Sequence, residues 1–560
     1  MDQKAEKAYK TYFDCVRQLK KLKRVALNDL NTLYNVSCRI ARDGEYAALI
    51  ESARPAGERC LNELIESFFG EYNNLYGLEI RDNLTEFLDP ELASGSYFII
   101  DSYKKDDTGR LSELAPTDFS AGETAYVRVL HKSHESSSPV VSKKLSLIAV
   151  EDGGKTFTKS VENTSSIDFE LSLDKPGYFK FKVLALDKNG KCVLGSETAY
   201  GGIVFSREEI RTYHEPPYDL SDFWDSEIRR LMNTDPRDSV ADKYNGRVET
   251  LYGMPEKNRF SLKKLDKEYI RMLEENKQPS PTEEELSKYD VYEVCLKCPG
   301  PTPATGYVSI PKNAKKGSLP IYISYDGYSI RSPAPFMKED AISLHCSHHG
   351  YELGHPDTYY AEIRNTVGGN YCLGNGEINS GFEDIHDCYP LYIMLRDLQL
   401  IRFLTDKSLS FDIEGLSDVW CGEVILWGSS MGGYQTIGVG ALTSIMKKYL
   451  PCSFSLTLEA GSPAFADVAG HTGGRVHSSM FTYQDGADYF DTAILASLID
   501  SPTSIFRASL GDEICTATSM SAIYNMIPEN VRKEIRYVQN SSHGYIPEED
   551  MQRWYTYKNY

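Results

Sequence analysis

The feature that most constrains the fold is a short apolar segment that runs into a glycine-rich turn near residue 430. Residues 424–427 are apolar, the next five read Gly428-Ser429-Ser430-Met431-Gly432, and residues 434–446 are compatible with a helix. A strand, a G-x-S-x-G turn and a helix form the context of a nucleophile elbow, in which a strained turn exposes the serine hydroxyl above a sheet. Flanking glycines keep Cβ atoms out of the crowded corner. An ordinary turn between a strand and a helix also fits this pattern.

Length and charge exclude several classes of protein. A chain of 560 residues exceeds one ordinary core, so we expect two or three domains. The 61 basic and 81 acidic residues give a net charge of −20, which argues against non-specific nucleic-acid binding. No run of about 18 apolar residues is present, so no membrane span is expected. The polar first residues predict no signal peptide, hence a cytoplasmic protein whose 12 cysteines are reduced.

Residues 1–80 are predicted to be helical, because apolar side chains recur at helical spacing in two stretches. Pro55-Ala56-Gly57 marks a break between the stretches, since proline and glycine are the strongest helix breakers. Either a helical cap on a neighbouring domain or an oligomerisation arm would account for this segment.

Residues 81–206 change to short, alternating segments bounded by turns. The predicted strands are 97–103, 125–131, 144–150, 167–173 and 179–186. Asn189-Gly190 adds a hairpin-turn signal. Strands at this spacing indicate a β-sandwich of the immunoglobulin-like kind, although the Cys/Trp/Cys core pattern is missing. The domain could be a structural spacer or could bind carbohydrate.

Beyond a linker at residues 207–220, strands and helices alternate through residues 221–560. Strands are predicted at 321–325, 342–346, 454–458, 504–510 and 536–538. An amphipathic helix is predicted at 389–404, and the charged stretch 263–290 is interpreted as a surface insertion. Alternation of this kind predicts a mostly parallel sheet covered by helices.

The residues needed to activate a serine occur in a suitable order. A serine hydroxyl needs a base to take its proton, and the base needs an acid that sets its tautomer. In α/β-hydrolases the chain order is serine, acid, histidine. Here Ser430 is followed by Asp512, just past an apolar strand, and then by His543 in a loop. Glu513 and Asp491 are alternative acids.

An oxyanion hole needs two backbone N–H donors aimed at the tetrahedral oxygen. Met431 directly follows the nucleophile, and Tyr325 ends an early strand, so their N–H groups are the candidates.

Two other groups of residues could be metal ligands. Cys295 and Cys298 form a lone C-x-x-C, for which no second pair is placed to complete a zinc site. His345, Cys346, His348 and His349 are also close in sequence, but alternate residues of a strand point to opposite faces. We therefore interpret this group as a loop near an acyl pocket, and we expect no metal and no organic cofactor.

Residues 221–560 resemble the acetyl xylan esterase and cephalosporin C deacetylase family of carbohydrate esterases. The matching segments are Asp222-Phe223-Trp224-Asp225, Val291-Tyr292-Glu293-Val294, Gly306-Tyr307-Val308, Ile310-Pro311-Lys312, Tyr325-Asp326-Gly327, Gly428-Ser429-Ser430-Met431-Gly432-Gly433, Ala487-Asp488-Tyr489-Phe490-Asp491, Ser509-Leu510-Gly511-Asp512-Glu513 and His543. The resemblance implies an α/β fold, with an α/β-hydrolase domain preceded by the sandwich and the helical segment, as in longer family members.

Two departures from the family pattern concern specificity. His349-Gly350 stands where shorter members carry Arg-Gly-Gln, and Met431 replaces a glutamine. By the resemblance, His349, Gly350 and Tyr328 are the predicted substrate-binding residues.

The resemblance implies an esterase that removes acetyl groups from acetylated xylo-oligosaccharides or related sugars through an acetyl-enzyme intermediate. No nucleic-acid or membrane partner is expected, and a homo-oligomer is possible because family members form rings. An acyltransferase or a peptidase could use the same triad, and a carbohydrate-binding protein with an inactive hydrolase domain is the non-enzymatic alternative.

Overall fold

The computed structural model describes most of the chain beyond residue 95. The described residues are 48, 96–106, 108–133, 136–152, 154–186, 199–238, 260–300, 302–328, 330–347, 349–367, 382, 384–410, 412–469, 483–544 and 553–560. The predicted helical segment 1–80 (apart from Ala48), the Asn189-Gly190 turn and His348 lie outside them. Contacts divide the chain into two units, one of Met1–Phe205 with Gln539–Arg553, the other of Ser206–Val538 with Trp554–Tyr560.

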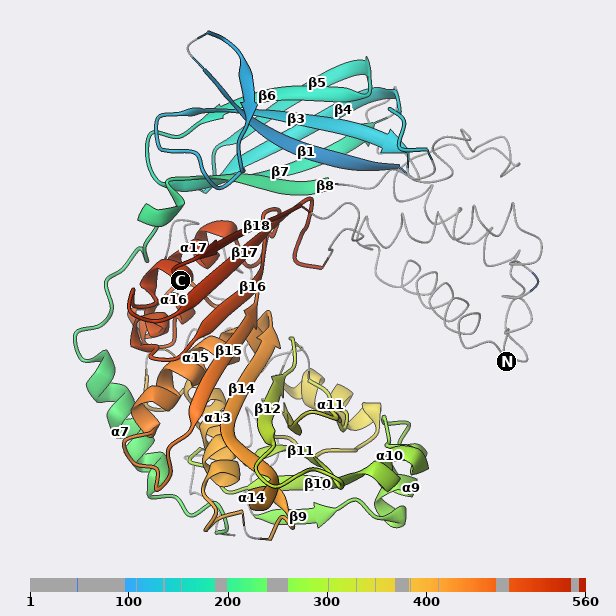
Figure 1. The fold of residues 1–560 in the computed structure, drawn as a ribbon, viewed down its shortest axis with the longest axis vertical. Helices are drawn as coiled ribbons and strands as arrows, with labels where there is room; N and C mark the ends of the chain where they lie inside the picture. Colours follow the sequence, from blue (N-terminus) through green and yellow to red (C-terminus); the bar gives the residue numbers. More distant parts are fainter. Residues whose placement is uncertain are drawn as a thin grey trace. The chain divides into compact units, whose positions relative to one another are not determined.

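The first unit contains a sandwich of two antiparallel sheets (Figure 1). One sheet has the order β2-β1-β3-β6, formed by β1 (Ser96–Lys105), β2 (Leu111–Glu113), β3 (Thr124–Ser133) and β6 (Ser166–Ser172). The other has the order β5-β4-β7-β8, formed by β4 (Ser142–Glu151), β5 (Thr156–Thr164), β7 (Gly177–Leu186) and β8 (Ala199–Phe205). Buried apolar side chains from both sheets form one core.

All five predicted strands of the sandwich are present, and three further strands were missed. β5 lies at an edge and has mostly exposed side chains, so it lacks the alternation that identifies a half-buried strand. β2 is only three residues long and fully exposed. β8 contains Gly201 and Gly202, and glycine weakens a strand signal. The immunoglobulin-like assignment of this sandwich stays a prediction.

The second unit is built on a ten-stranded sheet with the order β18-β17-β16-β15-β14-β12-β13-β11-β10-β9. Its strands are β9 (Ser261–Lys264), β10 (Tyr289–Leu296), β11 (Ala304–Pro311), β12 (Leu319–Tyr325), β13 (Ile342–Ser347), β14 (Trp420–Ser429), β15 (Ser455–Gly461), β16 (Thr503–Ser509), β17 (Lys533–Gln539) and β18 (Arg553–Lys558). From β13 to β17 neighbouring strands are parallel, whereas β9, β10 and β11 pair antiparallel. The mostly parallel sheet is therefore confirmed.

The interpretation of residues 263–290 as a surface insertion is wrong in part. β9 pairs with β10, so the start of this stretch is a strand of the central sheet. Two short helices follow, α9 (Lys267–Glu275) and α10 (Glu283–Lys288). β9 has exposed and half-exposed side chains because it lies at the sheet edge, and this hid it among the charged residues.

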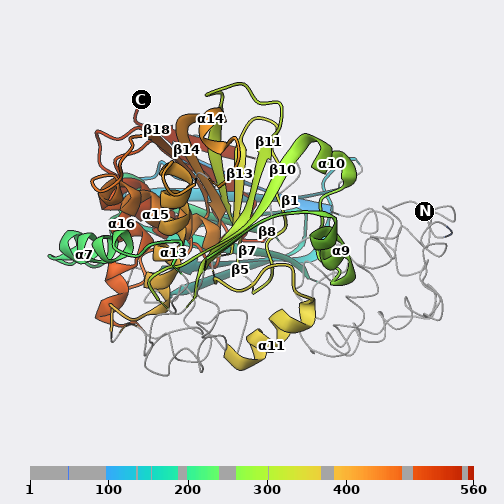
Figure 2. The same cartoon turned by 90° about the horizontal axis from the view of Figure 1, so that it is seen from below.

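Helices cover the sheet, and one of them, α15, begins directly after the candidate nucleophile Ser430. They are α7 (Leu220–Met232), α11 (Asp357–Val367), α13 (Tyr389–Thr405), α14 (Leu416–Val419), α15 (Met431–Met446), α16 (Thr492–Leu495) and α17 (Ala517–Met526). α15 packs on β14 and β15, and α13 packs on α15 (Figures 1 and 2). Short 3-10 turns occur at Arg207–Glu209, Asp485–Tyr489 and Ala496–Leu498.

The helix at 389–404 is present as α13, but its predicted amphipathic character is wrong. All of its residues are buried, because α7, α15 and β11 pack around it. Two of its polar side chains find partners inside the protein: Arg396 donates to Thr302 at 2.7 Å, and Gln399 donates to the Lys297 carbonyl at 2.7 Å.

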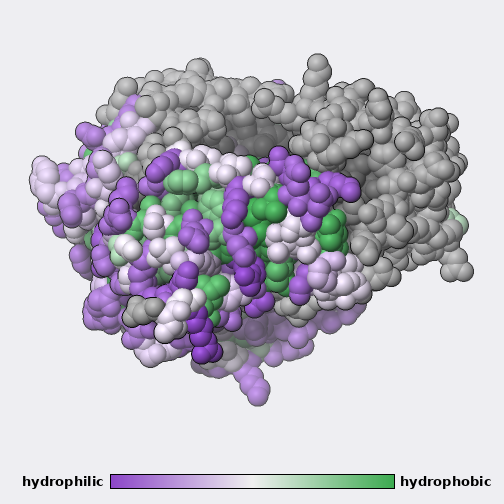
Figure 3. All heavy atoms as spheres, turned by 90° about the horizontal axis from the view of Figure 1, so that it is seen from above, coloured by the Kyte–Doolittle hydropathy of each residue, from purple (hydrophilic) through white to green (hydrophobic). Residues whose placement is uncertain are grey.

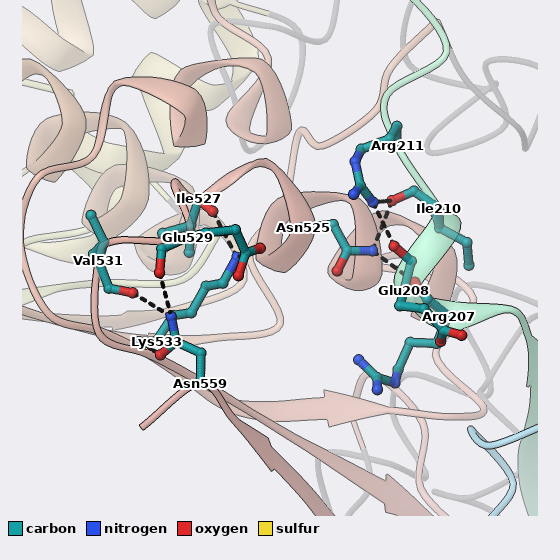
Figure 4. Close-up of polar contacts among 10 residues, drawn as sticks. All are labelled: Arg207, Glu208, Ile210, Arg211, Asn525, Ile527, Glu529, Val531, Lys533 and Asn559. Atoms are coloured by element: carbon teal, nitrogen blue, oxygen red, sulfur yellow. Dashed lines mark hydrogen bonds and ion pairs between the residues drawn. The ribbon is translucent and has the colours of Figure 1, made fainter.

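Side-chain hydrogen bonds fasten both ends of the second unit to its body (Figure 4). Asn525 of α17 donates to the carbonyls of Arg207 and Ile210, at 2.7 and 2.8 Å. At the other end, Asn559 donates to the Val531 carbonyl at 2.6 Å and accepts from the Lys533 N–H at 2.8 Å. Both ends of the unit are thus held by residues between α17 and the start of β17.

The view of Figure 3 shows hydrophobic side chains between hydrophilic ones on the face drawn there. Leu111 and Val141 are exposed on the sandwich, and scattered apolar side chains are ordinary on protein surfaces. Within the described part of the chain, no helix combines the length and apolar character that crossing a membrane requires.

Candidate active site

The turn between β14 and α15 is strained at Ser430. This residue has φ 59° and ψ −117°, a backbone conformation that residues with a side chain rarely adopt. A Cβ atom on Gly428 would clash with the backbone of Gly432, and one on Gly432 would clash with the Tyr325 carbonyl. The turn therefore has the geometry expected of a nucleophile elbow, and both glycines of the pattern have a steric reason.

Backbone hydrogen bonds hold the strained turn in place. The Ser430 N–H donates to the Gly461 carbonyl at 2.8 Å. The Ser430 carbonyl accepts from Ala464 N–H and Tyr434 N–H, both at 2.9 Å. The end of β15 and the first turn of α15 thus fix Ser430 from two directions, which is what maintains a costly φ/ψ combination.

A partly buried arginine that the sequence analysis missed lies beside this turn. Arg507 donates from Nη2 to the hydroxyl of Ser429 at 2.8 Å. The register of β16 shifts against both β15 and β17 around this residue, and such bulges re-aim side chains next to functional sites. Burial lowers the pKa of the Arg507 guanidinium, and the Asp512 carboxylate opposes that shift. Arg507 thus links the nucleophile turn electrostatically to the candidate acid.

Asp512 is fully buried in the turn after β16. Its carboxylate accepts hydrogen bonds from the N–H groups of Ile514 and Cys515, both at 2.8 Å. In the sheet, only β15 separates β14 from β16, and all three are parallel. Ser430 and Asp512 therefore both follow strand ends at the carboxyl edge, where sites of open α/β sheets form.

His543 lies in the loop that directly follows β17 (Lys533–Gln539). Val538 of β17 pairs with Ser509 of β16, so these two strands end side by side. The five residues from 539 to 543 can span at most about 17 Å when fully extended. His543 is half-buried and lies in Gln539–Arg553, a segment that contacts group with the first unit. The short connection limits how far this histidine can lie from the end of β17.

Of the two alternative acids, Asp491 stabilises the fold as the N-cap of α16. Its carboxylate caps α16 by accepting from Ala493 N–H at 2.8 Å, and it also accepts from Asp467 N–H at 2.9 Å and Val468 N–H at 2.6 Å. Burial, with the nearby Asp467 charge, raises the pKa of Asp491 to about 7. Glu513 is exposed in the turn. Asp512 is thus the buried acid that directly follows a strand of the sheet.

The two candidate oxyanion donors flank the elbow. Met431 is the first residue of α15. Tyr325 is the last residue of β12 and pairs with Gly428 of β14. Because a Cβ on Gly432 would meet the Tyr325 carbonyl, the backbone of Tyr325 lies directly against the turn.

The three predicted substrate-binding residues, His349, Gly350 and Tyr328, differ in burial and in backbone conformation. The His349 ring is buried, hydrogen-bonded to the Tyr389 hydroxyl and stacked at a centroid distance of 5.8 Å on both Tyr351 and Tyr389. Gly350 has φ 71°, and Tyr328 is half-buried just beyond β12. The substrate-binding role of these residues stays a prediction, and for His349 it would be exerted through its neighbours.

His345 and Cys346 occupy successive positions of β13, so their side chains point to opposite faces. The His345 ring is hydrogen-bonded through Nδ1 to the Ala334 carbonyl, 2.7 Å away, and its Nε2 lies 3.1 Å from the Asp326 carboxylate without hydrogen-bond geometry. These partners give His345 a role in fixing the loop after β12.

A buried polar cluster beneath the elbow was also missed by the sequence analysis. Asp397 of α13 accepts from the side-chain amide of Gln435 of α15 at 2.7 Å. Within the described residues, the other Asp397 oxygen and the hydroxyls of Tyr325 and Tyr434 are buried without a hydrogen-bond partner. Sites of this kind usually hold ordered water. Only tertiary packing brings these residues together, so no local pattern in the sequence identifies the cluster.

We expect Asp397 to make the protein less stable as the pH rises. Burial raises the pKa of Asp397 to about 7, above the unfolded value of about 3.9. Its contribution is therefore fully present below about pH 4 and is lost as the pH rises through about 7. Asp397→Asn should raise stability at pH 8 by roughly 4 kcal/mol and have little effect at pH 4, measured by chemical denaturation.

The exposed Asp340→Asn variant is the control and should follow the wild type at both pH values. Asp491 leaves some pH dependence in every variant. An Asp397→Asn protein that loses as much stability as the wild type between pH 4 and pH 8 would contradict the prediction.

We expect Arg507 and Ser429 to act as one unit in positioning Ser430, the candidate nucleophile. Arg507→Met and Ser429→Ala should each lower kcat on an aryl acetate about tenfold, because a hydrogen bond to a charged group contributes roughly 1.5–3 kcal/mol. The double variant should be no slower than the slower single variant, since both changes remove the same bond. Losses that multiply in the double variant would mean that the two side chains act independently.

Comparisons with known proteins leave the family of the chain open. No protein-family model matches it, and no curated protein matches it. Among solved structures, it is similar to an acetyl xylan esterase from Paenibacillus sp. R4, with 17% identity over 61% of this chain and 95% of that one and a TM-score of 0.40. For acetyl xylan esterase 1 from Thermoanaerobacterium sp. JW/SL YS485, the values are 16% identity, 61% and 93% coverage, and a TM-score of 0.39. A bacterial heroin esterase shares 12% identity over 46% of this chain and 77% of its own, with a TM-score of 0.28.

Proposed function

We propose that this protein is a serine esterase that removes small acyl groups, chiefly acetyl, from sugar hydroxyls. The observation that carries the proposal is the strained conformation of Ser430 between β14 and α15, at φ 59° and ψ −117°. A turn that costs this much free energy is retained where function needs it. The resemblance of residues 221–560 to carbohydrate esterases suggests acetylated xylo-oligosaccharides or related sugars as the substrate class.

In the proposed reaction, the Ser430 hydroxyl attacks the acetyl carbonyl and His543 takes its proton. The tetrahedral oxyanion accepts hydrogen bonds from the N–H groups of Met431 and Tyr325. When the intermediate collapses, His543 returns the proton to the departing sugar hydroxyl. A water molecule, deprotonated by His543, then attacks the acetyl-enzyme and releases acetate.

Asp512 orients His543 in this scheme. Its carboxylate accepts from two backbone N–H groups, of Ile514 and Cys515, which fix its orientation. A buried and pre-oriented carboxylate can hold one tautomer of the histidine and stabilise the imidazolium that forms during the reaction.

The test is acetate release by the full-length protein from acetylated xylo-oligosaccharides, with a small aryl acetate assayed in parallel. Acetate release from both substrates would support a carbohydrate esterase. Turnover of the aryl acetate alone would keep the esterase mechanism and reject xylan fragments as the substrate. Release that requires an added sugar acceptor would identify an acyltransferase, and no turnover of either substrate would favour a carbohydrate-binding protein.

A further inference from the structure

A pocket separate from the elbow lies over the antiparallel part of the sheet, in the same unit. It encloses about 160 Å³. Its floor follows the strand register: Glu293 of β10 pairs with Lys263 of β9, and Cys295 pairs with Ser261 on one side and Thr305 on the other. A cavity of about 150 Å³ takes a benzene molecule, so this pocket has room for one six-membered ring.

The pocket walls come from α9 and from the loop after β13. α9 contributes Tyr269 and Met272, and the loop contributes residues 350–353 and His355. Gly350 and Gly354 both have φ 71°, and a Cβ on Gly354 would lie 2.7 Å from the Leu273 side chain. The loop can approach α9 this closely only with glycine at that position, which makes the wall a built part of the fold.

The floor of the pocket holds a carboxyl group that the proposed reaction does not use. Glu293 is largely buried, and burial raises its pKa, while a hydrogen bond from the Tyr269 hydroxyl opposes the shift. The Tyr269 hydroxyl also lies 3.1 Å from that of Tyr307. A buried acid is costly to a fold, and at the bottom of a pocket it is a candidate ligand-binding group.

The pocket lining carries two carboxyl groups, one ammonium group and a histidine. Lys263 faces Glu293 across the strands, and His355 lies 2.8 Å from the Glu352 carboxylate. The carboxyl groups disfavour a phosphate, and the Lys263 ammonium disfavours a free metal ion. Carboxyl, ammonium and hydroxyl groups beside the Tyr269 and Tyr351 rings suit a neutral ring that carries several hydroxyl groups.

The pocket opens at the same edge of the sheet as the elbow. Thr305 on its floor pairs with Ser347, the last residue of β13, and β13 lies beside β12, which ends at Tyr325 next to Gly428. β10 is the fourth strand from β14 in the order β14-β12-β13-β11-β10. At about 4.8 Å per strand this separation is roughly 19 Å, a distance that an oligosaccharide of a few units spans.

We propose that this pocket binds one unmodified sugar residue of the same oligosaccharide whose acetyl group reaches Ser430. The proposal rests on the proposed esterase function for the identity of the ligand. The affinity of the protein for an oligosaccharide should therefore depend on the length of the sugar chain. Glu293 would accept a hydrogen bond from a ring hydroxyl or donate one to it.

The test measures binding without turnover. Xylotetraose is titrated calorimetrically into the full-length Ser430→Ala protein, alone and combined with Glu293→Gln or with Cys295→Met, which fills the floor. Each pocket variant is expected to weaken binding about tenfold or more, because a hydrogen bond to a charged group is lost or the ring is excluded. The control is Glu284→Gln, which removes a charge from an exposed ion pair with Lys288 on α10, outside the pocket, and should leave the affinity unchanged.

Kinetics of the catalytically intact protein separate the two proposals. Glu293→Gln should raise KM for acetylated xylotetraose, whereas the control Glu284→Gln should leave both KM and kcat unchanged. Pocket-dependent xylotetraose binding without any acetate release would overturn the esterase and retain the sugar site. Acetate release with no xylotetraose binding, or with binding that both pocket variants retain in full, would overturn the sugar site alone.

Discussion

Replacing Ser430 by alanine is expected to lower kcat on an acetyl ester by at least about 1,000-fold, because removal of a serine nucleophile leaves only binding and oxyanion stabilisation. The fold should be unaffected or slightly more stable, since alanine is no larger than serine and the turn is held by backbone hydrogen bonds to Gly461 and Ala464. Steady-state kinetics and thermal denaturation of the purified variant check both statements.

The neighbouring serine provides a matched control. Ser429→Ala removes a hydroxyl one residue away that accepts a hydrogen bond from Arg507. It should cost only about tenfold, the effect expected for one charge-assisted hydrogen bond. Equal losses in Ser429→Ala and Ser430→Ala, or a Ser430→Ala protein with wild-type kcat, would place the chemistry elsewhere.

Asp512→Asn is expected to lower kcat by about 10,000-fold while KM changes little, because an amide in place of the carboxylate favours the wrong tautomer of the histidine. Asparagine has almost the same shape, and its oxygen can still accept from the N–H groups of Ile514 and Cys515. The variant should therefore fold, which circular dichroism and the melting temperature would confirm.

Asp491→Asn is the comparison that separates the two buried acids. Asp491 caps α16 and accepts from several backbone N–H groups, so its loss should affect the free energy of unfolding more than kcat. If Asp491→Asn abolished turnover and Asp512→Asn preserved it, the acid of the proposed triad would have to be reassigned.

Strand prediction from the sequence worked where alternation reflects burial and failed where strands are exposed or, in β8, interrupted by glycines. β1, β3 and β7 bury alternate side chains, and their pattern identified them. β5 and β9 lie at sheet edges with largely exposed side chains, so their sequences resemble those of charged loops. Pairing with a neighbour, rather than any internal pattern, makes these two segments strands.

α13 illustrates a different limit of sequence reasoning. Its polar residues suggested a solvent-facing side, yet Asp397 accepts from Gln435 and Arg402 donates to the Leu231 carbonyl at 2.9 Å inside the protein. Whether a polar residue of a helix faces water or a buried partner depends on elements far away in the chain, which periodicity cannot reveal.

The sequence by itself determined the turn at Ser430, because a short strand, closely spaced glycines and a helix specify a strained corner through local sterics. It also determined that Asp512 follows a strand. Only the tertiary structure decided that Asp491 is the buried acid that caps a helix. It also decided how a bulge brings Arg507 into contact with Ser429. The pocket around Glu293, formed by β9, β10 and a distant loop, likewise exists only in the folded protein. These features are stabilised by contacts between segments that are remote in the chain, so the sequence pattern of any one segment cannot predict them.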